Sequence, residues 1–155
     1  MVTILAVVVG AAASYVASSR AERRAFERSL ATRWDDRTLT AYVEYISSVK
    51  AVFRRARQVL RVRDEGHDCA SFLAKLEEDE HHRSLLFESI LLLADKETIE
   101  IAHRLNREIW RILDLARDPD CGASSLDETA LFALLSEFGR AARADLHVDT
   151  QVGQT

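Results

Sequence analysis

Apolar residues recur at alternating steps of three and four along the middle of the chain, the spacing of one helix face. Over residues 39–60 they form a heptad-like seam of Leu39, Tyr42, Ile46, Val49, Phe53, Ala56 and Leu60. Val52 and Val59 widen this seam on one side, which favours a helix facing a bundle over a narrow two-stranded coil. We therefore predict a first helix that runs to about Arg63 and is stopped at Gly66.

Two further helices follow from the same spacing. A second helix is expected from about Ala70 to Ala94, with a polar run over residues 77–84 that we interpret as a solvent-facing side. A third helix begins after Asp95, a residue type that caps helix starts, and its predicted inner positions follow. They are Ile99, Ala102, Leu105, Ile109, Ile112 or Leu113, and Ala116.

The fourth helix follows a break at residues 118–122, where Asp, Pro and Gly interrupt the pattern. Ser125 and Glu128 have the spacing of a capping box at its start. Its predicted inner positions are Leu131, Leu134, Phe138, Ala142 and Leu146. Five Gly and one Pro in 155 residues are too few for the turns of an all-β chain.

The predicted fold class is all-α: an N-terminal transmembrane helix that continues into an antiparallel, up-down-up-down four-helix bundle. We expect a transmembrane anchor over residues 1–19, a basic juxtamembrane helical stalk over 20–38, the bundle over 39–146 and a flexible tail over 147–155. The first helix would then be both the membrane stalk and a member of the bundle.

The predicted anchor rests on an uncharged run, Val2 to Ser19, which spans about 27 Å as a helix. Two alternatives stay open: a cleaved signal peptide ending near residues 17–19, and a buried helix of a soluble domain. Lys and Arg follow the run but do not precede it, so the positive-inside rule predicts a single-pass cell-membrane protein with most of the chain in the cytoplasm. The first arginines after the run are candidates for contact with anionic membrane lipid: Arg20, Arg23, Arg24 and Arg28.

Small residues recur every four positions within the predicted anchor, at Ala6, Gly10, Ser14 and Ser18. A stripe of small residues lets two transmembrane helices approach closely. We therefore expect the chain to form a homo-oligomer.

Several local patterns resemble those of small single-span helical membrane proteins of high-G+C bacteria, a group to which no activity is assigned. The resemblance rests on the uncharged run with its Arg-rich junction, and on the residues Trp34, Arg37, Ala41, Tyr42, Tyr45, Ile46, Leu91 to Asp95, Ile99, Ala102, and Ala141 to Leu146. It covers most of the chain and implies a topology and a fold, but neither an activity nor catalytic residues.

Charge is divided unevenly between the two parts of the chain. Residues 20–63 hold twelve Lys and Arg against five Asp and Glu, whereas residues 64–155 hold nine against twenty. Four basic residues form a stripe offset from the apolar seam: Lys50, Arg54, Arg57 and Arg61. Either the basic first helix pairs electrostatically with its acidic neighbours, with the acidic run over residues 77–80 lying near the stripe, or the stripe binds an acidic partner protein. Nucleic acid is disfavoured, since no aromatic residue interleaves the stripe and the net charge is −4.

Two Glu-x-x-His pairs, Glu78 with His81 and Glu100 with His103, have the spacing of di-metal carboxylate sites in four-helix bundles. Such a site also needs single carboxylates from the other helices, for which Glu44 and Glu137 are available. The first pair lies in the polar run, and Arg104 shares the side of the second. These neighbours argue against a metal site.

Cys69 and Cys121 lie in or beside the first and third connections, which share one end of an antiparallel bundle. A disulfide between them requires an oxidising compartment, whereas a cytoplasmic location predicts free thiols.

The chain has no glycine-rich phosphate loop and no recognisable nucleophile triad, and we expect no cofactor. The expected function is a membrane-tethered helical interaction or scaffold module that is not an enzyme and that self-associates. The alternatives are a di-metal carboxylate four-helix-bundle enzyme and a secreted or surface-exposed helical domain.

Overall fold

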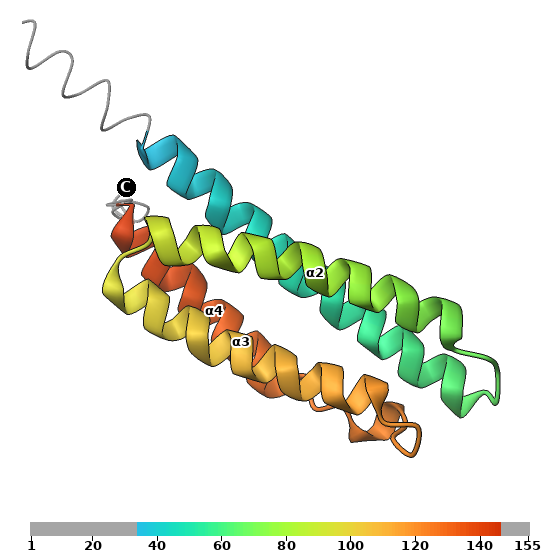
Figure 1. The fold of residues 1–155 in the computed structure, drawn as a ribbon. Coiled ribbons are helices and arrows are strands. Elements are labelled where there is room, and N and C mark those ends of the chain that lie inside the picture. Colours follow the sequence, from blue (N-terminus) through green and yellow to red (C-terminus); the bar gives the residue numbers. More distant parts are fainter. Residues whose placement is uncertain (1–33, 147–155) are drawn as a thin grey trace, which may run out of the picture. The chain divides into compact units, whose positions relative to one another are not determined.

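The computed structural model describes residues 34–146, and all regular secondary structure in this part is helical (Figure 1). A first helix covers residues 34–64 and is called helix 34–64 below. It is followed by α2 (Ala70–Leu93), α3 (Lys96–Arg117), the 3-10 turn η1 (Ala123–Ser125) and α4 (Thr129–Asp145). The predicted all-α fold class is confirmed. Residues 38–146 belong to one compact unit, distinct from the unit that ends at Arg37.

Helix 34–64 packs between α2 and α4. On the α2 side, the rings of Tyr45 and Phe87 lie 6.0 Å apart, and Arg55 Nε lies 3.1 Å from a carboxylate oxygen of Asp79. The residue numbers rise along one helix as they fall along the other, so the two helices run antiparallel. The same holds on the α4 side, where Tyr42 meets Phe138, Phe53 meets Phe132 and Arg57 meets Glu128.

The remaining two interfaces complete an antiparallel ring of four helices (Figure 1). Between α2 and α3, Phe87 contacts His103 edge-on at 5.4 Å, and Glu77 accepts two hydrogen bonds from Arg117. Between α3 and α4, Arg104 donates to Glu137 at 2.6 Å. Side chains from all four helices fill the space between them with apolar groups.

The core follows most of the predicted seam but is shifted at its ends. Val49, Ala56 and Leu60 are fully buried as predicted, whereas Leu39 is 49% exposed. Tyr45, which was outside the predicted seam, is fully buried between α2 and α4. A helix packed between two neighbours buries a wide face, and this face is centred closer to α2 than a narrow seam predicts.

Gly66 stops helix 34–64 as predicted. Its φ is +73°, the left-handed conformation that L side chains rarely adopt. The Gly66 N–H donates to Arg63 O, and the His67 N–H donates to Val62 O. This pair of hydrogen bonds is a Schellman motif, which satisfies two carbonyls that the end of the helix leaves free. The predicted cap of α3 is also confirmed, because Asp95 accepts a hydrogen bond from the Thr98 N–H at 2.8 Å.

The predicted capping box of the fourth helix is wrong. Ser125 ends the turn η1, and α4 begins only at Thr129, with the Asp127 carboxylate accepting the Thr129 N–H at 2.9 Å. The reason is a contact distant in sequence, since the Asp64 carboxylate accepts the N–H of Ala123 at 2.9 Å and holds the chain in the turn. Gly122 leaves room for this carboxylate, because a Cβ there would lie 2.2 Å from an Asp64 oxygen.

The first and third connections are clamped together by Arg63, at the end of helix 34–64. Its guanidinium donates hydrogen bonds to the carbonyl oxygens of Ala116 at 2.6 Å, Asp118 at 2.7 Å and Cys121 at 2.8 Å. Carbonyls at a helix C-terminus lack partners within the helix and carry partial negative charge. One arginine thus caps α3 and ties it to the end of a helix more than 50 residues earlier in the chain.

Within residues 34–146, no helix is both long enough and apolar enough to cross a membrane. On this finding we correct the predicted localisation, and a single-pass cell-membrane protein is not retained. The run from Val2 to Ser19, on which that prediction rested, lies outside the described residues. The predicted stalk up to residue 33 and the predicted tail lie outside them as well.

Candidate protein-binding surface

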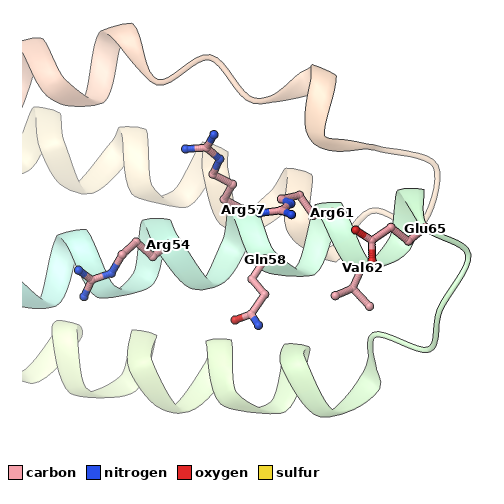
Figure 2. Close-up of a pocket in the computed structure, with 6 residues that line it drawn as sticks. All are labelled: Arg54, Arg57, Gln58, Arg61, Val62 and Glu65. Carbon is pink, nitrogen blue, oxygen red and sulfur yellow. The ribbon is translucent and has the colours of Figure 1, made fainter.

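The predicted basic stripe lies on the exposed surface of helix 34–64. Lys50, Arg54, Arg57 and Arg61 are all exposed. The three arginines line an open depression of about 540 Å³ together with Gln58, Val62 and Glu65. Figure 2 shows these six side chains along helix 34–64. All of the lining residues belong to this one helix, so the feature is an open surface between long side chains and not an enclosed cavity.

The acidic run expected to neutralise this stripe is occupied by other cations. Glu77 pairs with Arg117, Asp79 pairs with Arg55, and Glu80 pairs with Arg83. The stripe lies on the α4 side of helix 34–64, as the Arg57–Glu128 contact shows, whereas the acidic run belongs to α2. Helix 34–64 does pair with its acidic neighbours, through Arg55 with Asp79 and Arg57 with Glu128, but the stripe itself does not pair with the acidic run.

Most of the stripe carries charge that nothing in the described part of the chain neutralises. Arg57 lies 3.5 Å from Glu128, and both side chains are about half exposed. An ion pair this exposed contributes little because water and salt screen it. Lys50, Arg54 and Arg61 have no ion pair within residues 34–146. A helix edge with three unpaired cations is a surface that attracts anionic groups.

Two exposed apolar residues precede the stripe on the same edge of the helix. Val43 is 56% exposed and lies seven residues, or two helical turns, before Lys50. Leu39 lies one helical turn before Val43 and is 49% exposed. The edge is therefore apolar over its first two turns and basic over the next three, a pattern suited to a polypeptide partner rather than to a nucleic-acid backbone.

Sequence reasoning missed a buried ion pair inside the bundle. Arg83 is 1% exposed, and its guanidinium donates two hydrogen bonds of 2.7 Å to the Glu80 carboxylate, one turn earlier on α2. Arg83 Nη1 and the Tyr45 hydroxyl are both buried and interact with each other, but neither atom has a hydrogen bond of ordinary geometry within residues 34–146. The detectable signal was the spacing, because Leu76, Glu80, Arg83 and Phe87 continue the three-four pattern of buried positions through the polar run.

Burial shifts the titration of the two core tyrosines. Desolvation raises the pKa of Tyr45 to about 12, although the nearby Arg83 charge acts in the opposite direction. Desolvation also raises the pKa of Tyr42, and the hydrogen bond from its hydroxyl to the Asp145 carboxylate raises it further. Both phenols therefore stay neutral at pH values where those of the unfolded chain ionise.

We expect Tyr45→Phe to make the fold less sensitive to alkaline pH. An unfolded tyrosine ionises near pH 10 and folded Tyr45 near pH 12, so stability linked to this phenol is complete below pH 10 and is lost between pH 10 and 12. At neutral pH the change in unfolding free energy should stay within about 1 kcal/mol, because the hydroxyl makes no hydrogen bond of ordinary geometry and its neighbour Arg83 keeps its bonds to Glu80. Denaturant unfolding at pH 7 and pH 11 measures both effects.

Tyr42→Phe is the matched comparison for this experiment. It removes a hydrogen bond to Asp145 and should lower stability already at neutral pH, by about 1 kcal/mol. An equal loss at pH 7 in both variants would contradict the assignment to Tyr45 of a hydroxyl without a hydrogen bond of ordinary geometry.

The predicted metal ligands are not brought together. Glu78, His81, Glu100 and His103 are all exposed. Glu100 is near Lys96, the His103 ring packs on Phe87, and Glu137 accepts from Arg104. Within residues 34–146, no group of three His, Cys, Asp or Glu side chains is placed to hold a metal ion.

The two cysteines lie at the bundle end where the first and third connections meet, as expected, and both are free. Cys69 is the N-cap residue of α2. The Cys121 thiol donates to the Asp118 carboxylate at 3.4 Å, and this hydrogen bond raises the pKa of the thiol.

Two of the predicted sites lie outside the described residues and stay predictions. They are the small-residue stripe of Ala6, Gly10, Ser14 and Ser18, and the lipid-contact group of Arg20, Arg23, Arg24 and Arg28.

Comparison of the chain with protein-family models, with curated proteins and with solved structures finds no significant match.

Proposed function

We propose that this protein is a helical interaction module without catalytic activity, which binds an acidic protein surface through Lys50, Arg54, Arg57 and Arg61 and which also self-associates. The observation that carries the proposal is the unneutralised charge of this stripe. Three of its four cations have no ion pair within residues 34–146, although the chain as a whole is acidic.

The rest of the bundle supports the same interpretation. Three arginines elsewhere in the bundle make structural contacts: Arg63 caps α3, Arg83 is buried with Glu80, and Arg117 pairs with Glu77. The stripe makes one such contact, the exposed pair of Arg57 with Glu128, so the described part of the fold does not explain the charge of its other three residues. Its two apolar neighbours, Leu39 and Val43, extend the surface in a way that suits a protein partner.

The proposal predicts salt-sensitive binding of an acidic polypeptide. Poly-L-glutamate should bind the full chain, with an affinity that falls steeply as salt is added, because exposed charges are screened within about 10 Å at 0.1 M salt. Changing all four stripe residues to Gln should reduce the affinity at low salt by at least about tenfold. Fluorescence anisotropy of labelled poly-L-glutamate measures this.

A control variant with the same net charge separates the stripe from general electrostatics. Lys75, Lys96, Arg107 and Arg140 are exposed and lie on other helices, so changing these four to Gln should leave binding nearly unchanged. Equal losses in the two variants, or tighter binding of duplex DNA than of poly-L-glutamate, would contradict the proposal.

A further inference from the structure

A second exposed surface with apolar and charged halves lies on the outward side of α2. Leu92 is 85% exposed and Leu85 is 57% exposed. Glu78 is also exposed, and it lies seven residues before Leu85, as Leu85 lies seven before Leu92. A seven-residue step is close to two full helical turns, so these three residues follow one line along the helix. From Leu92 to Glu78 this line is apolar and then acidic.

This line on α2 complements the edge of helix 34–64. The edge is apolar at Leu39 and Val43 and basic from Lys50 onwards. From Leu39 to Arg54 the rise is about 22 Å, and from Leu92 to Glu78 it is about 21 Å. If the two lines lie antiparallel, Leu92 and Leu85 meet the apolar residues Leu39 and Val43 at one end. Glu78 then meets the basic stripe at the other end.

The two surfaces cannot meet within one chain. Arg57, on the stripe, reaches Glu128 of α4, whereas the α2 side of the same helix is occupied by the Arg55–Asp79 contact. Leu85 and Leu92 face away from the bundle, as their exposure shows. Contact between the surfaces therefore needs two copies of the chain.

We propose that the chain self-associates by docking the α2 line of one copy, Leu92, Leu85 and Glu78, against the edge Leu39, Val43 and Arg54 of helix 34–64 in the next copy. The inference rests on the proposed function, of which it names one partner. Because the two surfaces differ, each copy keeps one of each free after pairing, and assembly continues beyond the dimer into rings or open chains.

The test uses one variant for each surface. Val43→Glu places an acid opposite the α2 line, and Leu92→Lys places a cation opposite the helix edge. Both side chains are more than half exposed, so neither change disturbs the core. In sedimentation velocity experiments the wild-type chain should form concentration-dependent species larger than a dimer, whereas each variant alone should be monomeric.

Mixing the two variants gives the decisive result. Val43→Glu keeps an intact α2 line and Leu92→Lys keeps an intact helix edge, so an equimolar mixture should form dimers although neither variant associates alone. Trp110→Lys, at an exposed aromatic residue on α3 that belongs to neither surface, should associate as the wild type does. A monomeric wild-type chain, single variants that still assemble, or a mixture without dimers would each overturn the inference.

Leu92→Lys and the wild-type chain keep this inference separate from the proposed function. Leu92 lies on α2, away from the edge of helix 34–64, so Leu92→Lys should bind poly-L-glutamate with wild-type affinity. A wild-type chain that binds poly-L-glutamate but stays monomeric would refute the second-copy contact alone, whereas a wild-type chain that does neither would also refute the stripe as a binding surface.

Discussion

Replacing Glu80 by Leu should lower the free energy of unfolding by about 3–5 kcal/mol. The change leaves the Arg83 guanidinium buried at 1% exposure without the carboxylate that accepts both of its hydrogen bonds. A buried charge without a counter-charge is among the most destabilising single defects in a protein core. Urea unfolding followed by circular dichroism measures the loss.

Two control variants test whether the unpaired charge is the cause. Adding Arg83→Met to Glu80→Leu removes both charges and should restore most of the lost stability, because a buried ion pair is often matched by apolar residues of similar volume. Glu108→Leu breaks a pair of the same spacing with Arg111, whose side chain is 43% exposed, and should cost at most about 1 kcal/mol. Similar losses at Glu80 and Glu108 would contradict the role assigned to burial.

Arg63→Met should lower the free energy of unfolding by about 2–3 kcal/mol. Three backbone carbonyls lose their donor at once, and one of them, that of Ala116, belongs to a fully buried residue of α3. Each hydrogen bond to a charged group contributes roughly 1.5 kcal/mol or more, less what water restores, above all at the exposed Asp118 carbonyl. Hydrogen exchange should also speed up in the last turn of α3, because this turn loses its cap.

Arg63→Lys tests whether the positive charge of Arg63 or the shape of its guanidinium stabilises the fold. Arg63→Lys keeps the positive charge near the C-terminus of α3, but one ammonium cannot reproduce the planar fork that reaches all three oxygens. It should recover about half of the stability lost in Arg63→Met. Arg61→Met, two residues earlier and without such bonds, should change stability by less than about 0.5 kcal/mol. Full rescue by lysine would show that charge alone matters.

The parts of the fold that were predictable are those set by local periodicity. The inner positions of α3, from Ala102 to Ala116, are buried as predicted, because this helix has a single uninterrupted apolar face. Gly66 and Asp95 acted as predicted for a similar reason, since a left-handed stop and an N-cap each depend on a few adjacent residues.

The parts that were not predictable depend on contacts between distant residues. The predicted start of α4 is wrong because the Asp64 carboxylate accepts a hydrogen bond from the Ala123 N–H. A capping-box pattern is local and does not indicate a contact between such distant residues. The polar run of α2 was interpreted as a solvent-facing side because charge in a sequence signals exposure. Glu80 and Arg83 are buried although they are charged, because they form an ion pair with each other inside the core.

The stripe shows the limit for the candidate site. Its four residues lie exposed along one edge of one helix, as their spacing predicts, but the sequence left open which neighbouring helix this edge faces. The answer depends on which side of helix 34–64 packs on α2, and that follows only from the packing of the whole bundle. Because Arg55 and Arg117 pair with acids of the run over residues 77–80, those acids do not neutralise the stripe.

The clamp at Arg63 and the Tyr42–Asp145 hydrogen bond lie at opposite ends of the same ring of helices. Residues 38 and 146 consequently lie near one another, although the whole compact unit separates them in sequence. The same packing of the four helices is thus compatible with other orders of connection along the chain. A circularly permuted chain, with a short linker joining these two residues and new ends at the connection between α2 and α3, would leave every helix contact and the clamp in place.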